Sequence, residues 1–187
     1  MKVSEIIAGF LYQRQTKTVY CVSGGASLHL IHALKTEGIH YVCPQHEQAA
    51  GFAADATARL GGTGVAIATS GPGATNLITA IGASYYDSVP VLYLTGQVVT
   101  FRMSGDSGCR QIGFQETPIV EMVKPITKYA VTVMDKNEII YELEKAWYLA
   151  HEGRPGPVLV DIPDDIQRQD TELIRMRHFI PADSGSW

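Results

Sequence analysis

The sequence predicts an α/β fold in which helices cover both faces of an open, mostly parallel sheet of about six strands. Short apolar runs alternate along the chain with segments of helical periodicity, and turns that contain glycine separate them. The run 64–69 (GVAIAT) is apolar without alternation, which is typical of a strand that is buried on both faces of a parallel sheet. These observations indicate three layers, with a helix in each crossover between parallel strands.

Local patterning predicts each element in turn. The first helix is expected over residues 4–14, with Ser4 as its N-cap. Its apolar positions recur at helical spacing and are Ile6, Ile7, Phe10 and Leu11. The expected strands are 18–22, 39–43, 64–69, 89–95, 127–133 and 157–162. The later helices are expected over 28–35, from about 46 to the glycines at 61–62, from about 76 to 87, over 116–123 and over 136–151. Residues 98–115 lack periodicity, and polar connections of this length are usually functional or mobile.

The composition is that of a globular protein. Residues 1–167 are long enough for one domain with its own core, and the pattern ends in 168–187, which we expect to begin a linker. The net charge of -4 and the lack of a Lys/Arg cluster argue against a nucleic-acid surface. No apolar run is long enough to cross a bilayer, and the first residues lack the apolar core of a signal peptide. We therefore expect a soluble, cytoplasmic protein without membrane contact.

The cysteines and histidines indicate no metal or disulfide framework. Cys21, Cys43 and Cys109 are odd in number, widely spaced and form no C-x-x-C string, which fits a reducing compartment. His29 and His32 lie three residues apart on one helix but lack a partner ligand at a telling spacing.

Three acidic residues gather at the end of the last strand, at Asp161, Asp164 and Asp165. A metal or ligand site there is one interpretation, and capping of the following turn is the favoured one. We therefore assign no metal ligands.

The stretch 41–56 joins an apolar strand to a helix rich in small residues, and it carries the strongest candidate for chemistry. Glu47 stands in the first turn of that helix, at a strand-to-helix junction, where open α/β sheets bind ligands. The small face that the helix is expected to bury comprises Ala49, Ala50, Ala53 and Ala54. Taken alone, a first-turn glutamate is more simply explained by the helix dipole. The zinc-protease string H-E-x-x-H is not completed after His46.

The turn Gly71-Pro72-Gly73 follows the buried strand 64–69. Its glycines allow a sharp bend and let a flat ligand approach the main chain. It is a poor phosphate loop, because no G-x-x-x-x-G-K-[ST] string is present and Asn76 stands where G-x-G-x-x-G needs its third glycine. A nucleotide-binding Rossmann domain therefore lacks both of its fingerprints.

Taken together, five strings resemble the N-terminal pyrimidine-binding domain of thiamine-diphosphate enzymes, and among these the acetolactate (acetohydroxyacid) synthase catalytic subunits most closely. The strings are Glu47 with Gln48-Ala49-Ala50, the turn 70–76, residues 87–97, Phe114-Gln115-Glu116, and residues 153–163. The resemblance runs from about Ser4 to Gln167. Each string is weak alone, and the ordered set is specific.

The resemblance implies roles for individual residues. In such enzymes a glutamate, here Glu47, hydrogen-bonds N1′ of the aminopyrimidine, so that the 4′-nitrogen can take the proton from thiazolium C2. The cofactor then acts as the electron sink for decarboxylation of a 2-keto acid. The residues placed near the pyrimidine ring are Gly24, Gly25, Pro72 and Asn76. Phe114 and Gln115 are placed near the reacting substrate carbon, with Gln115 as a second catalytic residue.

By the same resemblance, the chain holds half of an active site. In the family a separate domain with a Gly-Asp-Gly string holds the diphosphate and its Mg²⁺, and this sequence has no such string. We therefore expect the isolated chain to be inactive without a diphosphate-binding domain or subunit. A homodimer is expected through the faces around the Glu47 helix and the turn 71–73. FAD, which true acetolactate synthases bind, is not indicated.

Two departures leave alternatives open. Ser23 stands where the synthases usually have proline before paired glycines, and the segment 101–113 is longer than the synthase loop and unlike it. A related keto-acid decarboxylase or carboligase therefore remains open. A non-catalytic or regulatory binding module of the same fold is the alternative of a different class, and Glu47 and Gln115 argue against it.

Overall fold

Six short apolar segments form one sheet with the strand order β2-β1-β3-β4-β6-β5, and every neighbouring pair is parallel. The structure is a computed structural model and describes residues 1–181. The strands are β1 (Thr18–Cys21), β2 (His40–Val42), β3 (Gly64–Ala68), β4 (Val91–Gln97), β5 (Tyr129–Thr132) and β6 (Val158–Pro163). All residues of β3, β4 and β6 are buried, whereas the edge strands β2 and β5 are partly exposed, because only central strands lie between two layers. The predicted α/β fold is confirmed.

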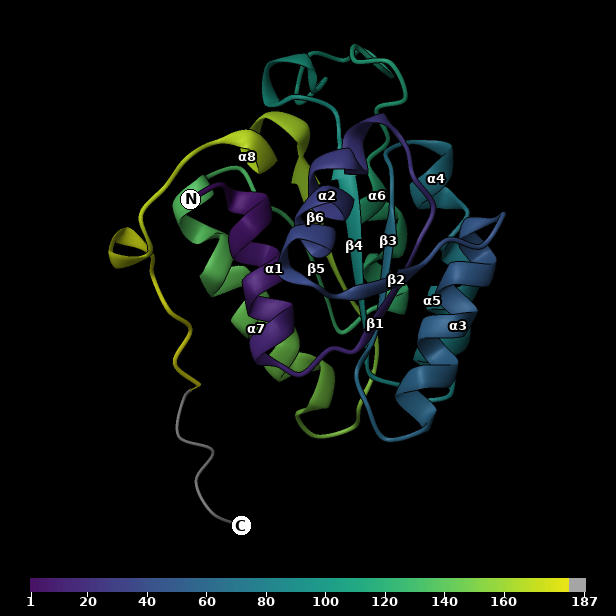
Figure 1. The fold of residues 1–187 in the computed structure, drawn as a ribbon. Helices are drawn as coiled ribbons and strands as arrows, with labels where there is room; N and C mark the ends of the chain where they lie inside the picture. Colours follow the sequence, from purple (N-terminus) through teal and green to yellow (C-terminus); the bar gives the residue numbers. More distant parts are fainter. Residues whose placement is uncertain (182–187) are drawn as a thin grey trace.

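Helices cover both faces of this sheet (Figure 1). On one face lie α1 (Val3–Gln13), α2 (Leu28–Glu37) and α7 (Ile139–His151), and on the other lie α3 (Glu47–Arg59), α5 (Ile78–Tyr86) and α6 (Ile119–Val123). Two short helices, α4 (Pro72–Thr75) and α8 (Asp164–Arg168), stand beyond the carboxyl ends of the strands. The single 3-10 turns are η1 (Gly25–Ser27), η2 (Thr100–Arg102), η3 (Lys124–Ile126), η4 (Lys136–Glu138) and η5 (Leu173–Arg175).

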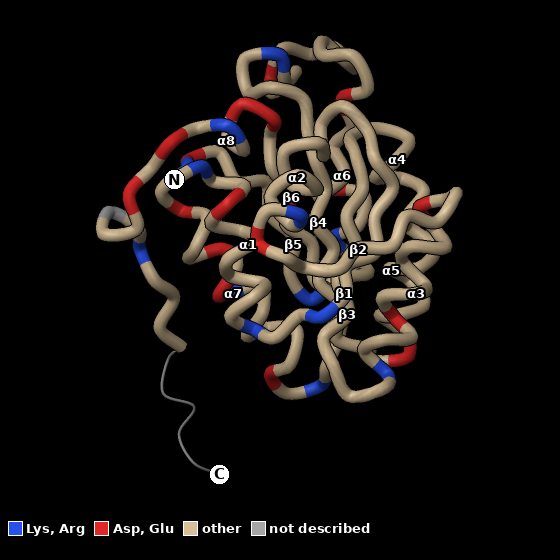
Figure 2. Tube along the Cα trace, viewed as in Figure 1, with Lys and Arg blue, Asp and Glu red and all other residues tan. Residues whose placement is uncertain are grey.

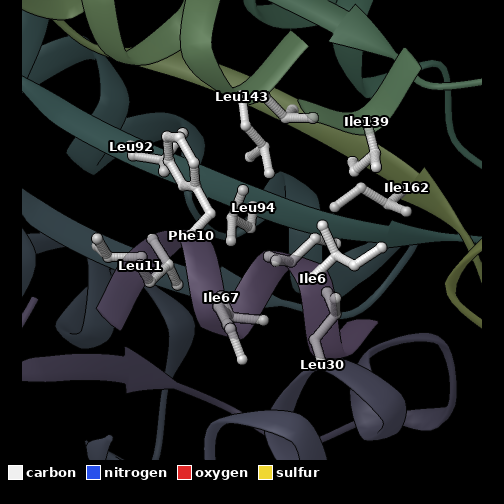
Figure 3. Close-up of a cluster of buried hydrophobic side chains, with 14 of the residues drawn as sticks. Ile6, Phe10, Leu11, Leu30, Ile67, Leu92, Leu94, Ile139, Leu143 and Ile162 are labelled. Atoms are coloured by element: carbon white, nitrogen blue, oxygen red, sulfur yellow. The ribbon is translucent and has the colours of Figure 1, made fainter. Parts of the chain in front are cut away.

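The larger part of the core fills the space between the sheet and the layer of α1, α2 and α7 (Figure 3). The side chains labelled there come from α1 (Ile6, Phe10, Leu11), α2 (Leu30), the strands (Ile67, Leu92, Leu94, Ile162) and α7 (Ile139, Leu143). Burying one such side chain contributes roughly 1.5–3 kcal/mol relative to leaving it exposed. The apolar positions predicted for the first helix are all buried.

On the opposite face, α3 lies very close to the sheet because its buried side is made of small residues. A Cβ added to Gly64 of β3 would lie 1.9 Å from the carbonyl oxygen of Ala54. A Cβ added to Gly51 of α3 would lie 2.5 Å from the Cβ of Ala80 in α5. The buried positions of α3 are Ala50, Gly51, Ala54, Asp55 and Ala58, and Ala53 is half-buried. Ala49, expected on this face, is exposed, because the buried stripe follows the helical period of 3.6 residues.

Two helix starts also differ from expectation. Ser4 is not the N-cap of α1; it is buried in the first turn, and Lys2 is the N-cap. The backbone N–H of Lys2 donates a hydrogen bond to Oε2 of Glu5 at 2.8 Å. The order of apolar and polar residues in the sequence does not predict this contact. The helix expected over 116–123 begins only at Ile119, after Pro118, whose ring suits a position just before a helix rather than within it.

The segment 169–181 follows the surface of α1 and α7. Two backbone hydrogen bonds of 3.0 Å join it to the N-terminus, from Val3 N to Gln169 O and from Thr171 N to Met1 O. Further along, Met176 is buried against the core and the ring of Phe179 packs 5.5 Å from that of Tyr148. The linker role of 168–187 stays a prediction, and residues 182–187 of it lie outside the described part.

Charged residues are unevenly spread over the fold (Figure 2). Lys and Arg lie at separated points of the trace, whereas Asp and Glu gather around α8 and the N-terminus. Groups of the same chain partly neutralise these acids: Arg168 pairs with Asp164 at 3.0 Å, and the N-terminal amine lies 3.8 Å from Asp170. No helix within residues 1–181 has the length and apolar character needed to cross a membrane.

A buried carboxyl group joins three strands at their carboxyl ends. Asp161 of β6, 1% exposed, accepts hydrogen bonds from Thr95 Oγ1 of β4 at 2.7 Å and from Thr132 Oγ1 of β5 at 3.1 Å. Gln97 Nε2 donates to it at 3.1 Å. Burial raises the pKa of Asp161 to about 6, although these three hydrogen bonds act in the opposite direction. The expectation that Asp161 caps a turn is therefore wrong; it cross-links the sheet.

We predict that Asp161→Asn removes a pH dependence of stability. Because the folded-state pKa is about 6 and the usual value is 3.8, stability from the protonated carboxyl is present below pH 3.8 and is lost as pH rises through 6. Relative to wild type, the variant should gain about 2 kcal/mol in unfolding free energy between about pH 4.5 and about pH 7. Urea denaturation of the full chain at both values measures this gain. The exposed Asp106→Asn is the control, and an equal effect of Asp161→Asn at both pH values would contradict the assignment.

Candidate functional site

The strand order of this sheet reverses next to β1, and the carboxyl ends of its strands form one edge of the sheet. The chain passes from β1 to its neighbour β2 on one side and then returns to place β3 on the other side. Ligands of open α/β sheets bind beyond the carboxyl ends of the strands at such a reversal. The connections that follow β1, β2 and β3 at this edge are residues 22–25, 43–46 and 69–71.

Glu47 is the first residue of α3 and is half-buried at this edge. His46, in extended backbone conformation, is the N-cap, and its ring Nδ1 accepts a hydrogen bond from the backbone N–H of Gln48 at 3.1 Å. Asn76 Nδ2 donates to Glu47 Oε2 at 2.9 Å. Within residues 1–181 no donor reaches Oε1, which lies beside Gly73. One carboxylate oxygen is therefore held, and the other is available to a ligand.

Thr69 lies between two glycines of the site. A Cβ on Gly24 would lie 2.4 Å from Thr69 Cγ2, and a Cβ on Gly73 would lie 2.7 Å from the same atom and 3.3 Å from Glu47 Oε1. The hydroxyl of Thr69 accepts from the backbone N–H of Ala26 at 3.1 Å. Both glycines are thus required by close packing. Sequence reasoning missed the role of Thr69, for which the only signal was its place between the buried strand and the Gly71 turn.

Gly25 differs from Gly24. A Cβ added to Gly25 would meet no atom within 4 Å, so no close packing requires glycine there. Gly25 begins η1, and Pro72 is the first residue of α4, where proline lacks only an N–H that would be unpaired in any case. Gly25 and Pro72 thus lie on the connections that follow β1 and β3.

Gln115 packs on the Gly71 turn through its backbone. A Cβ on Gly71 would lie 2.7 Å from the carbonyl oxygen of Gln115. Both residues have positive φ, 60° for Gly71 and 64° for Gln115. For a residue other than glycine this conformation costs roughly 1–2 kcal/mol. The neighbouring Phe114 is 84% exposed, so its ring is not packed within this chain.

Glu116 holds the loop that carries Phe114 and Gln115. Its carboxylate accepts hydrogen bonds from Ser104 N at 2.5 Å and Ser104 Oγ at 2.7 Å, and from Ile112 N at 2.8 Å. Gly113 N donates to it at 3.4 Å. Burial acts to raise the pKa of Glu116, but these hydrogen bonds outweigh it and the pKa is lowered. The loop lies beyond the strand ends at the top of Figure 1, and one carboxylate joins Ser104 to Ile112 and Gly113 within it.

Other features of the structure lie away from this edge. Within the described residues, no group of three or more His, Cys, Asp or Glu is arranged to hold a metal ion. A cavity of about 800 Å³ lies at the opposite end of the sheet, near Thr18, Thr63 and Pro90, which precede or begin β1, β3 and β4. The cavity therefore does not contain Glu47.

We predict that Glu116→Gln loosens the loop. The amide presents an N–H group to backbone N–H donors and removes the negative charge, so the chain should lose about 2 kcal/mol of unfolding free energy. Amide hydrogen exchange at Ser104, Ile112 and Gly113 should become faster. The control is Glu121→Gln, an exposed first-turn glutamate of α6. Unchanged protection of these three amides would show that Glu116 does not hold the loop.

Comparison with known proteins identifies relatives of this chain. A family model described as "Thiamine pyrophosphate enzyme, N-terminal TPP binding domain" matches residues 1–122. The chain is 46% identical over 170 residues to the chloroplastic acetolactate synthase of Arabidopsis thaliana, covering 90% of this chain and 24% of that protein. It is 40% identical over 191 residues to the acetolactate synthase isozyme 3 large subunit of Escherichia coli (strain K12), covering 97% and 32%.

These matches cover most of this chain but only part of the relatives. The family model covers more than half of the 187 residues, and the Glu47, Asn76 and Gly73 arrangement lies inside the matched region. The chain spans about a quarter to a third of the length of the curated relatives. The chain belongs to the thiamine pyrophosphate enzymes and is similar over most of its length to the N-terminal part of acetolactate synthases.

Proposed function

We propose that this chain is the pyrimidine-binding half of a thiamine-diphosphate enzyme that acts on 2-keto acids, as an acetolactate synthase does. The observation that carries the proposal is the held carboxylate of Glu47, with Oε2 bonded to Asn76 and Oε1 beside Gly73. The 46% identity to an acetolactate synthase supports the reaction class, decarboxylation followed by carboligation.

The residues at the strand ends fit the aminopyrimidine of the cofactor. A carboxyl oxygen without a donor of its own can share a proton with a ring nitrogen, and the open space at Gly25, where a Cβ would meet no atom within 4 Å, leaves room for a flat ring. Gly24, against which Thr69 packs, keeps its place in the proposed set. Pro72 and Asn76 complete the proposed set. Bound there, thiamine diphosphate supplies the electron sink for decarboxylation.

Each side chain then has a stated task. Glu47 holds the proton between Oε1 and the ring nitrogen N1′, and Asn76 fixes which carboxyl oxygen faces the ring by donating to the other. Gln115 and Phe114 contact the 2-keto acid. The hydrogen bonds of Glu116 hold the loop that carries them, and the backbone of Gln115 lies against Gly71.

The proposed active site is completed by other polypeptide. No Gly-Asp-Gly string is present in the 187 residues, so the diphosphate and Mg²⁺ are assigned to another domain or subunit. We propose a homodimer that forms through α3 and the 71–73 turn, and the 41% exposure of Phe52 on α3 supports an apolar contact there. The proposal includes neither FAD nor a particular compartment; the cytoplasm stays a prediction, and the plant relatives are named chloroplastic.

The Glu47→Gln substitution in the assembled enzyme tests the catalytic assignment. The glutamine side chain can still accept from Asn76, so the fold should be retained, but it cannot exchange a proton with the cofactor. We expect kcat with a 2-keto acid to fall at least about 100-fold. Glu121→Gln, at an exposed glutamate of α6 that pairs with Lys124, should leave kcat unchanged. Survival of full activity in the Glu47→Gln variant would refute the role.

Calorimetric titration of this chain with thiamine diphosphate and Mg²⁺ tests the half-site. We expect no binding or very weak binding, because the groups that hold the diphosphate are absent from the sequence. The assembled enzyme is the positive control. Tight binding by the isolated chain would contradict the half-site and would require a phosphate site elsewhere in it.

A further inference from the structure

Two cysteines that are far apart in sequence lie side by side at the edge of the sheet. β1 and β2 pair in register, with Thr18 opposite His40 and Tyr20 opposite Val42. One further step of that register places Cys21 beside Cys43, and their Sγ atoms are 3.7 Å apart. Both are free thiols.

The backbone separation suits a disulfide. Neighbouring strands lie about 4.8 Å apart, which falls within the range of about 4.4–6.8 Å between the Cα atoms of bonded cysteines. The two sulfurs must approach by about 1.7 Å to reach the bond length of a disulfide. Cys43 lies just after β2 on an exposed connection, so its side chain has freedom to move, whereas Cys21 is buried.

We infer that Cys21 and Cys43 form an oxidation site at which a peroxide converts the dithiol into a disulfide. The exposed Cys43 reacts first: its thiolate attacks the O–O bond, takes one oxygen as sulfenic acid and releases water after protonation. The sulfur of Cys21 then attacks the Cys43 sulfur, and the sulfenic oxygen leaves as a second water with the Cys21 proton. The two sulfurs together lose two electrons to the peroxide, and the S–S bond forms.

The environment of Cys21 explains this order. Burial, a hydrogen bond with Cys43 and the nearby Cys43 charge raise the pKa of Cys21 to about 12, so it is not the first nucleophile. Because the Cys21 sulfur lies 3.7 Å from that of Cys43, it can react with the sulfenic acid before a second peroxide molecule does.

The bond would also act on the candidate site, a step that rests on the proposed function. Gly24 follows Cys21 by three residues, and Glu47 follows Cys43 by four. A pull of about 1.7 Å on Cys43 is transmitted through the short connection 43–46 to the first turn of α3. Oxidation would thereby shift the Glu47 carboxylate relative to Asn76 and Gly73.

Peroxide treatment of the full chain tests the oxidation site. The Cys109→Ser variant removes the remaining thiol, which lies on the exposed 98–115 loop. After hydrogen peroxide and alkylation, it should lose both free thiols and yield a Cys21–Cys43 linked peptide that dithiothreitol separates. The matched control Cys43→Ser/Cys109→Ser should show no linked peptide. Two retained thiols, or sulfinic acid at Cys43 without a link, would overturn the inference.

Hydrogen exchange tests the coupling without any measurement of activity. In the oxidised Cys109→Ser variant, the backbone amides of residues 45–48 should exchange more slowly than in the reduced form, because the cross-link restricts local opening. The difference should vanish in Cys43→Ser/Cys109→Ser. A disulfide that forms without changing this exchange would refute the coupling to Glu47. If the Glu47→Gln variant kept full activity, the proposed function would fail, but the disulfide and hydrogen-exchange results would be unaffected. Failure of the proposed function and failure of the oxidation site can therefore be told apart.

Discussion

The close contact of α3 with β3 is the constraint on which the candidate site depends. No side chain larger than hydrogen fits at Gly64 or Gly51, because backbone and Cβ atoms of Ala54 and Ala80 already occupy that space. The position of the helix against the sheet is therefore fixed, and this also fixes the position of Glu47 in its first turn. A catalytic carboxyl group is more precisely held on such a helix than on a loop.

The same edge is completed by segments from distant parts of the chain. Asn76 holds one oxygen of Glu47, while Thr69 fills the space between Gly24 and Gly73. The hydrogen bonds of Glu116 hold the long loop 98–115, and the backbone of Gln115 in this loop packs against Gly71. The strained φ of Gln115 persists because the surrounding hydrogen bonds determine it, which is common at functional sites.

Two reactive groups with different requirements, Glu47 and the Cys21–Cys43 dithiol, lie at this edge of the sheet. Glu47 needs a fixed carboxyl group next to open space, whereas the Cys21–Cys43 dithiol needs one mobile, exposed sulfur beside a buried one. Both requirements are met where β1 and β2 end, since the strand ends are anchored and the connections beyond them are accessible. Movement at Cys43 therefore reaches Glu47 over one short connection.

The sequence by itself determined the layers of this fold and the place of Glu47. Buried strands, helical periodicity and glycine turns are local signals, so the order of elements and the strand-to-helix junction at Glu47 could be predicted from neighbouring residues. Local signals did not place Lys2 rather than Ser4 at the start of α1, because the hydrogen bond from the Lys2 N–H to the Glu5 side chain decides it. The expected buried face of α3 also included Ala49, which the helical period leaves exposed. Strand order and register were decided only by the tertiary structure. Because those pairings join residues far apart in sequence, local patterns could not predict the Thr69 contacts, the Asp161 cross-link or the 3.7 Å approach of Cys21 to Cys43.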